Sequence, residues 1–267
     1  MSIKKTLTTI GLVLVGTLMG NLSANAALVP DPVSNDIFVS FRASGGQGAS
    51  TSYIVNLGQA SQFTESGPLT ILSGLGNIGA DLTANFGSDW YTRTDVYWSI
   101  YGHNTNGGNP IIYGSVERAL DDVRSTPYPA LDQSSRQNVD SQIVSVLEQT
   151  GGYKGLTATA NSPVGAFQAN STSASSYNFQ VATPGTSDFG SLSGWTTIEG
   201  SFGTGDSVLD LWRYAGSGTT YRGNFTIDNA GVISFNTAAV PEPSTYALLA
   251  IAGIALLFMR HRRSVRA

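Results

Sequence analysis

The sequence contains no cysteine, which removes several classes of chemistry at once. Thiol catalysis, disulfide bonds and zinc-thiolate sites all need a cysteine side chain. Histidine is also scarce, because His103 is the only one outside the C-terminal segment. His103 lies in a Gly- and Asn-rich stretch, where we expect it to be solvated, and no G-x-S-x-G motif supports a hydrolase triad around it. The sequence therefore predicts no cofactor and no metal ion.

Charged residues make up only 12% of the 267 residues, and they are unevenly distributed. Six of the fourteen Lys and Arg lie in the terminal segments, whereas seventeen of the eighteen Asp and Glu lie in the body between them. Eight basic and seventeen acidic residues give this body a net charge of −9. An acidic body without a basic patch is not expected to bind nucleic acid, and anionic lipid surfaces would repel it.

Residues 1–26 have the three parts of a secretory signal peptide. Lys4 and Lys5 form the positive region, residues 7–19 are largely apolar, and Ala24 and Ala26 form an A-x-A cleavage site. The alternative is an uncleaved anchor, but the apolar stretch is short for a membrane span. We expect recognition by the export machinery and signal peptidase, with Ala27 as the first mature residue.

The body is rich in Gly, Ser, Thr and Asn and shows short β-type runs separated by turn residues. We predict a single mainly-β domain over residues 27–239, an antiparallel sandwich or barrel-like fold with one to three short helices. Its N- and C-terminal strands are expected to share a sheet. Strands are predicted at residues 36–42, 52–57, 69–72, 94–101, 110–116, 207–214, 219–227 and 231–235, helices at residues 80–86, 132–149 and 163–170, and a long surface segment at residues 170–193.

Few patterns in the body indicate catalysis. Residues 74–79 form a G-x-G-x-x-G, but the helix after them is too short for a dinucleotide-binding βαβ unit, so we interpret them as a glycine-rich turn. The four glutamates of the body show no spacing that singles out a glycosidase pair. Asp121 and Asp122, or Asp206 and Asp210, are alternatives for loop-bound Ca²⁺, although no EF-hand ladder is present.

An aromatic cluster in the first half of the body is a candidate sugar-binding surface. Aromatic rings exposed on a sheet can stack on sugar rings, but strand alternation also favours packing of one face into the core. The two interpretations stay open at this point. The candidate stacking residues are Trp90, Tyr91, Tyr97 and Tyr101, and Trp98 completes the cluster.

The C-terminal segment, residues 240–267, combines three features in a fixed order. Pro241, Glu242 and Pro243 come first, residues 246–259 are apolar, and a basic cap follows at Arg260, Arg262 and Arg263. This arrangement resembles the PEP-CTERM sorting signal of exported bacterial proteins. The resemblance implies recognition by an exosortase, cleavage near the motif, and association with exopolysaccharide and biofilm matrix.

The length of the apolar run bears on how long the protein stays in the membrane. Fourteen helical residues span about 21 Å, which is short of a hydrocarbon core about 30 Å thick. The basic cap would stay on the cytoplasmic side, and the body would face outward. We expect a helix that anchors the protein in the inner membrane transiently, before the body reaches the cell surface or the exterior. The alternative is a permanent anchor.

Three hypotheses for function follow from these features. The first is a non-enzymatic surface or extracellular-matrix protein, sorted and processed through its C-terminal signal. The second is a carbohydrate-binding module in the same location. The third is an exported hydrolase whose site has no recognisable motif.

Overall fold

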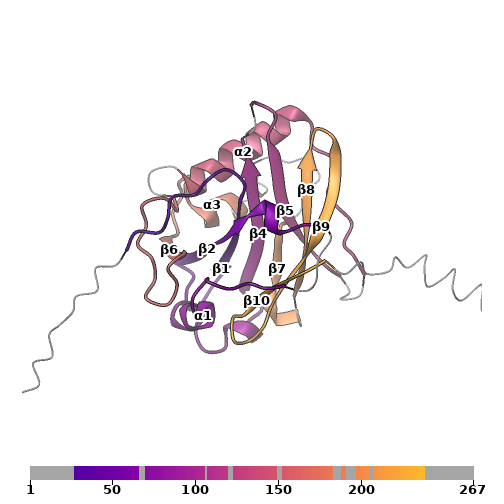
Figure 1. Ribbon diagram of the computed structural model, residues 1–267. Coiled ribbons are helices and arrows are strands. Elements are labelled where there is room, and N and C mark those ends of the chain that lie inside the picture. The colour runs from indigo at the N-terminus through magenta and orange to yellow at the C-terminus, as the bar shows by residue number, and fades with distance from the viewer. Residues whose placement is uncertain are drawn as a thin grey trace, which may run out of the picture.

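The computed structural model describes residues 27–65, 70–105, 107–119, 123–148, 152–182, 188–190, 197–204 and 207–237. Their strands form one antiparallel sheet of ten strands, curled into a half-barrel, with three helices packed against it (Figure 1). The mainly-β prediction is confirmed. The strands are β1 (Asp36–Ala43), β2 (Thr51–Gln59), β3 (Thr70–Ile71), β4 (Val96–Asn104), β5 (Ile111–Glu117), β6 (Gly165–Ala169), β7 (Glu199–Ser201), β8 (Val208–Ala215), β9 (Gly218–Ile227) and β10 (Ile233–Asn236), and the helices are α1 (Ile78–Phe86), α2 (Gln133–Leu147) and α3 (Tyr177–Ala182).

The sheet brings the two ends of the body together. Its strand order is β3-β10-β9-β8-β5-β4-β1-β2-β6, and β7 pairs with β4. The strands nearest the N-terminus and the C-terminus therefore share one sheet, as the sequence predicted. Four of the nine strand pairs are hairpins between consecutive strands, namely β1–β2, β4–β5, β8–β9 and β9–β10.

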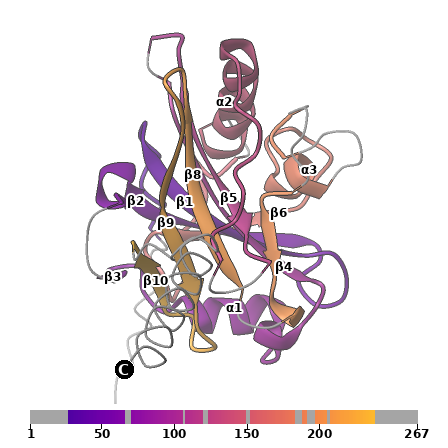
Figure 2. The same ribbon diagram turned by 90° about the vertical axis from the view of Figure 1, so that its right-hand side faces the viewer.

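Both faces of the sheet are buried, and each has its own apolar core. On β1, Ile37, Val39 and Phe41 point to a core shared with α1, which we call the α1 face. Phe38 points to the opposite core, shared with α2 and α3, which we call the α2–α3 face. Figures 1 and 2 show α2 and α3 on one side of the sheet and α1 at its lower end. Because strand side chains alternate, one sequence supplies both cores.

Local signals set the helix boundaries. Asp132 caps α2, since its carboxylate accepts the Ser135 N–H at 2.7 Å. The predicted apolar stripe of α2, which includes Val139, Ile143 and Val146, is buried. α1 ends before Gly87, whose φ of 98° only glycine adopts easily.

Two predictions about the middle of the chain are wrong. The segment expected to form a short helix near residues 163–170 is instead strand β6, which pairs with β2, so that β2 has β1 on one edge and β6 on the other. The segment expected at the surface contains α3, and both Tyr177 and Phe189 are buried. In both cases a partner distant in sequence decides the structure, and local periodicity does not report such partners.

The predicted signal peptide, with Ala24 and Ala26, and the C-terminal signal of residues 240–267 lie outside the described residues, as does the predicted apolar helix 246–259. Among the helices that the structure does describe, none is long and apolar enough to cross a membrane.

Candidate functional site

The described body begins and ends beside the two predicted signals. The Ala27 carbonyl accepts the Ala158 N–H at 2.8 Å, and Leu28 forms a β-bridge with Thr157. Val29, the third residue of the predicted mature chain, is already buried. At the other end, β10 stops at Asn236, whose carbonyl accepts the Asn224 side chain at 3.2 Å. The described fold therefore begins directly after the first predicted signal and ends just before the second.

Two of the four candidate stacking residues are buried, and the sugar-stacking prediction is wrong for them. Trp90 is 2% exposed and packs edge-on against Phe202, with ring centroids 5.1 Å apart. Tyr101 is 1% exposed, packs on Phe189 at 4.7 Å, and shares a 2.9 Å hydrogen bond with Ser40. Burial raises the pKa of the Tyr101 hydroxyl. The sheet is covered on both faces here, so neither ring can meet a sugar.

The other two candidates are half-buried. The Arg42 guanidinium lies 4.9 Å from the centre of the Tyr97 ring, a cation–π contact. The Tyr91 hydroxyl donates to the Ile227 carbonyl at 3.1 Å, which fixes the ring beside the β9–β10 turn. Tyr91 also lines a cavity.

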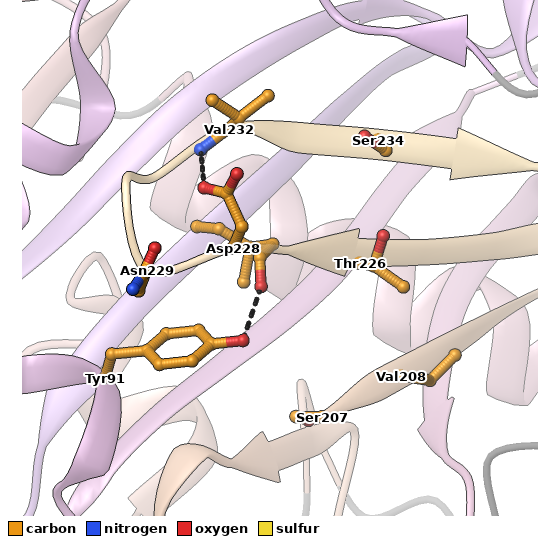
Figure 3. A pocket seen from close by; sticks show the side chains of 9 residues that line it. Tyr91, Ser207, Val208, Thr226, Asp228, Asn229, Val232 and Ser234 are labelled. Carbon is orange, nitrogen blue, oxygen red and sulfur yellow. Dashed lines mark hydrogen bonds between the residues drawn. The ribbon is translucent and has the colours of Figure 1, made fainter. Parts of the chain in front are cut away.

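The cavity beside Tyr91 has a volume of about 510 Å³, within the range of small-molecule sites. Figure 3 shows its walls converging from the Tyr91 segment, the start of β8, and the β9–β10 hairpin. A smaller cavity of about 170 Å³ lies on the other side of the β9–β10 turn and shares Val232 with it. The larger cavity is lined by Tyr91, Ser207, Val208, Thr226, Ile227, Asp228, Asn229, Val232 and Ser234.

Strand register builds the floor of this cavity. Thr226 on β9 is the direct neighbour of Val208 on β8 and of Ser234 on β10. The turn is held by Asp228, one carboxylate oxygen of which accepts the N–H groups of Ala230 and Val232, both at 2.9 Å. The sequence predicted the turn, but the juxtaposition of two hydroxyls across β9 and β10 needs the register and was missed.

The Ser207 hydroxyl in the cavity wall already has two hydrogen-bond partners. It accepts from the Trp98 indole N–H at 2.9 Å and donates to Glu117 at 3.0 Å. By contrast, the side chains of Thr226, Asn229 and Ser234 make no hydrogen bond to the described part of the chain. A ligand would find these three side chains, and the second carboxylate oxygen of Asp228, without a partner among the described residues.

The α2–α3 face holds a buried ion pair where β7 pairs with β4. Arg42 meets Glu199 through two nitrogens, with Nε–Oε1 at 2.8 Å and Nη2–Oε2 at 2.5 Å. The Tyr177 hydroxyl donates to the same carboxylate at 2.9 Å and contacts Ser99 at 2.6 Å. Burial lowers the pKa of Arg42, but the Glu199 charge and its hydrogen bonds outweigh this, and the net shift is upward. The pair joins β1, β7 and α3.

Asp188 is a second buried carboxylate near this pair. It is 2% exposed, and its Oδ1 atom has no hydrogen-bond partner among the described residues. Burial is the main cause that raises its pKa to about 7; the Ile198 N–H hydrogen bond opposes the shift, and the Glu199 charge adds to it. Asp188 is thus predominantly uncharged below neutral pH.

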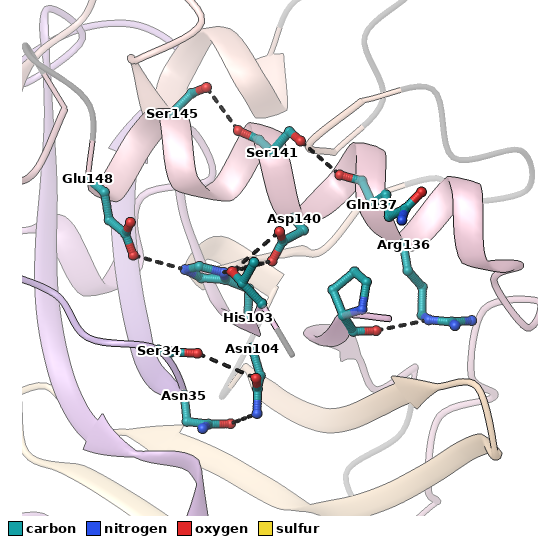
Figure 4. Close-up of polar contacts among 12 residues, drawn as sticks. Ser34, Asn35, His103, Asn104, Arg136, Gln137, Asp140, Ser141, Ser145 and Glu148 are labelled. Atoms are coloured by element: carbon teal, nitrogen blue, oxygen red, sulfur yellow. Dashed lines mark hydrogen bonds and ion pairs between the residues drawn. The ribbon is translucent and has the colours of Figure 1, made fainter. Parts of the chain in front are cut away.

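His103 is not solvated, and that expectation is wrong. It lies on β4, is 2% exposed, and faces α2, where its Nδ1 is 2.8 Å from Asp140 Oδ1 and its Nε2 is 3.5 Å from Glu148 Oε1 (Figure 4). The Gly/Asn stretch that suggested a loop begins only after Asn104. Asp140 lies within α2 and Glu148 is the residue that caps its C-terminal end, so His103 connects that helix to the sheet.

The candidate metal ligands have other partners or fall outside the described residues. Asp210 is fully buried and meets Arg118 at 2.7 Å and the Ser125 N–H at 2.6 Å. Asp121, Asp122 and Asp206 are not among the described residues. Within the part of the chain that the structure describes, no three His, Asp or Glu side chains gather as a metal site would require.

The G-x-G-x-x-G segment serves backbone packing. A Cβ on Gly76 would lie 2.2 Å from the Asn161 carbonyl oxygen, and one on Gly79 would lie 2.1 Å from the Ala230 carbonyl oxygen. Two of the three glycines therefore let α1 approach the residue 161–162 loop and the β9–β10 turn closely. This agrees with a structural turn in place of a cofactor fingerprint.

Comparison with known proteins identifies the C-terminal segment. The model of the PEP-CTERM protein-sorting motif matches residues 239–263, so the chain carries this motif at its C-terminus. The predicted residues Pro241 to Pro243 and the Arg260–Arg263 cap lie within the match. The motif marks an exosortase substrate, which is an exported protein sorted through its C-terminal signal. No curated protein and no solved structure matches the chain.

Proposed function

We propose that this chain is a non-enzymatic structural protein of the cell surface or extracellular matrix, delivered by export and processed at its C-terminal signal. The observation that carries the proposal is the sorting motif at residues 239–263, which starts two residues after the described body ends. Cleavage near Pro241 would leave every described strand intact. The apolar run would then hold the protein in the inner membrane only until the exosortase acts.

The chemistry of the body is consistent with a structural role. The buried charged groups hold elements together: Arg42 and Glu199 join strands and α3, His103 joins β4 to α2, and Arg118 pairs with Asp210. Side chains used in this way are not available to a substrate. We therefore assign these clusters to stability.

The test is the intact mass and C-terminal sequence of the protein purified from its native cells. We expect a species that begins at Ala27 and lacks residues 246–263. Replacing Pro241, Glu242 and Pro243 by alanine should prevent processing and leave a membrane-bound precursor, whereas Ser244→Ala should be processed normally. A mature wild-type protein that retains the apolar run would contradict processing and favour a permanent anchor.

Carbohydrate binding is a second candidate function, favoured by the cavity beside Tyr91. Its lining combines an aromatic ring, apolar side chains and unpaired hydroxyl and amide groups. Such a mixture suits a ligand with both C–H and O–H surface. On this hypothesis the exported body would hold extracellular polysaccharide while the C-terminal signal determines its location.

A further inference from the structure

The cavity beside Tyr91 has a composition that discriminates between classes of sugar. Its lining contains one carboxylate, Asp228, and no Lys, Arg or His. Behind the wall, Glu117 adds a second acidic group hydrogen-bonded to Ser207. A phosphate, sulfate or uronic acid entering here would meet negative charge with no cation to neutralise it.

The polar groups on the floor are arranged for a neutral, hydroxyl-rich ligand. Thr226 and Ser234 are cross-strand neighbours, so their hydroxyls lie side by side across β9 and β10. At the end of the floor, Asn229 is exposed on the turn, and one oxygen of Asp228 has no partner among the described residues. Hydroxyl and amide groups both donate and accept hydrogen bonds, as sugar hydroxyls do.

Apolar surface completes the site. Val208 and Ile227 are buried in the wall, and Val232 is 40% exposed at the rim that the two cavities share. Figure 3 shows the Tyr91 ring beside Asn229, held by its hydroxyl and therefore fixed in orientation. A pyranose has an apolar C–H face and a hydroxyl rim, which matches an apolar wall beside a polar floor.

We infer that the cavity bounded by Tyr91, Thr226, Asp228 and Ser234 binds neutral oligosaccharides and rejects anionic ones. This inference rests on the second candidate function, carbohydrate binding. It adds the location of the binding site and the class of its ligand. The sorting of the protein does not depend on it.

The experiment measures binding of the processed protein, purified from its native cells, to a glycan array. The array carries neutral gluco-, galacto- and manno-oligosaccharides and the corresponding uronic-acid oligosaccharides. The variants Thr226→Val, Ser234→Ala and Asn229→Ala each remove one unpaired polar group. Thr220→Val is the matched control, because Thr220 is exposed on the same strand β9 but does not line the cavity. Unchanged thermal unfolding shows that each variant is folded.

We expect neutral oligosaccharides to bind, each single cavity variant to weaken binding about 3- to 10-fold, and Thr220→Val to bind like the wild type. Binding that survives all three cavity variants would show that the site lies elsewhere, with carbohydrate binding itself intact. Preference for uronic acids would overturn the ligand class. Binding to no glycan would overturn both this inference and the carbohydrate-binding hypothesis.

Discussion

Asp188 is the residue whose environment departs most from that of an ordinary surface carboxyl. Other buried carboxylates have partners for both oxygens: Arg42 pairs with Glu199, Arg118 pairs with Asp210, and Tyr53, Thr159 and Asn161 donate to Asp81. Asp188 instead keeps one oxygen unpartnered among the described residues; burial raises its pKa, and the nearby charges of Glu199 and Arg42 act in opposite directions on it. Folding therefore favours its protonated form, and the stability of the protein should depend on pH through this group.

The direction of this pH dependence follows from the pKa of Asp188 in the folded protein and in the unfolded chain. Asp188 has a pKa of about 7 in the folded protein and 3.8 as its ordinary value. Between pH 4 and 7 the unfolded chain releases this proton while the folded protein keeps it, so the free energy of unfolding falls as pH rises. The loss amounts to roughly 4 kcal/mol by pH 7 to 8 and is absent below pH 4.

We predict that Asp188→Asn raises the free energy of unfolding at pH 8 by up to roughly 4 kcal/mol and leaves it nearly unchanged at pH 4. Urea titrations across this pH range measure the difference. Asp31→Asn is the control for loss of one negative charge, because Asp31 is 64% exposed in a surface pair with Lys154 and contributes under about 1 kcal/mol. A difference independent of pH would show that Asp188 is not protonated in the folded protein.

At the scale of elements, the β9–β10 hairpin and α1 depend on each other through glycine. Gly79 lies in α1, yet its missing side chain is what lets the Ala230 carbonyl approach. The same turn separates the two cavities. The contact between α1 and the turn therefore positions Asp228 and Val232 at the mouth of the larger cavity.

We predict that Gly79→Ala destabilises the protein by about 1–3 kcal/mol, because a Cβ 2.1 Å from the Ala230 oxygen forces the turn to move. Helix propensity alone would give the opposite sign, a gain of about 1 kcal/mol. Thr83→Ala, at an exposed position of the same helix, should be neutral or stabilise by under about 1 kcal/mol. Thermal unfolding compares the two, and a more stable Gly79→Ala protein would refute the close contact.

The elements that the sequence predicted well are those whose signals are local. α2 has its capping Asp132 and apolar stripe, and the last hairpin has its Asp228 turn. The wrong predictions concern segments whose structure depends on residues distant in sequence. β6 forms a strand because it pairs with β2, and His103 is buried because α2 covers it. The cavity could not be predicted for the same reason. The adjacency of Thr226 and Ser234 depends on strand register, which composition does not encode.

At the scale of the whole molecule, the described part of the fold begins directly after the predicted signal peptide and ends just before the sorting motif. The first residue after the predicted cleavage site already accepts a hydrogen bond from Ala158, and the last strand ends before the sorting motif begins. Both ends of the body also lie in one sheet. Removal of both signals should therefore leave the stabilising contacts of the body unchanged, and the signals should affect its location alone.

We predict that a chain of residues 27–237 unfolds at the same temperature as the full-length protein, within about 2 °C. A chain of residues 32–237 is the matched control, since it also lacks the buried Val29, its N–H bond to the Leu156 carbonyl at 3.0 Å, and the Ala27 bond to Ala158. Loss of one buried valine and these bonds should cost about 2–4 kcal/mol and lower the unfolding temperature by several degrees. Equal stability of the two chains would show that residues 27–31 are not part of the fold. A 27–237 chain that is clearly less stable than the full-length protein would show that a signal segment stabilises the body. Processing would then change the stability of the body as well as the location of the protein.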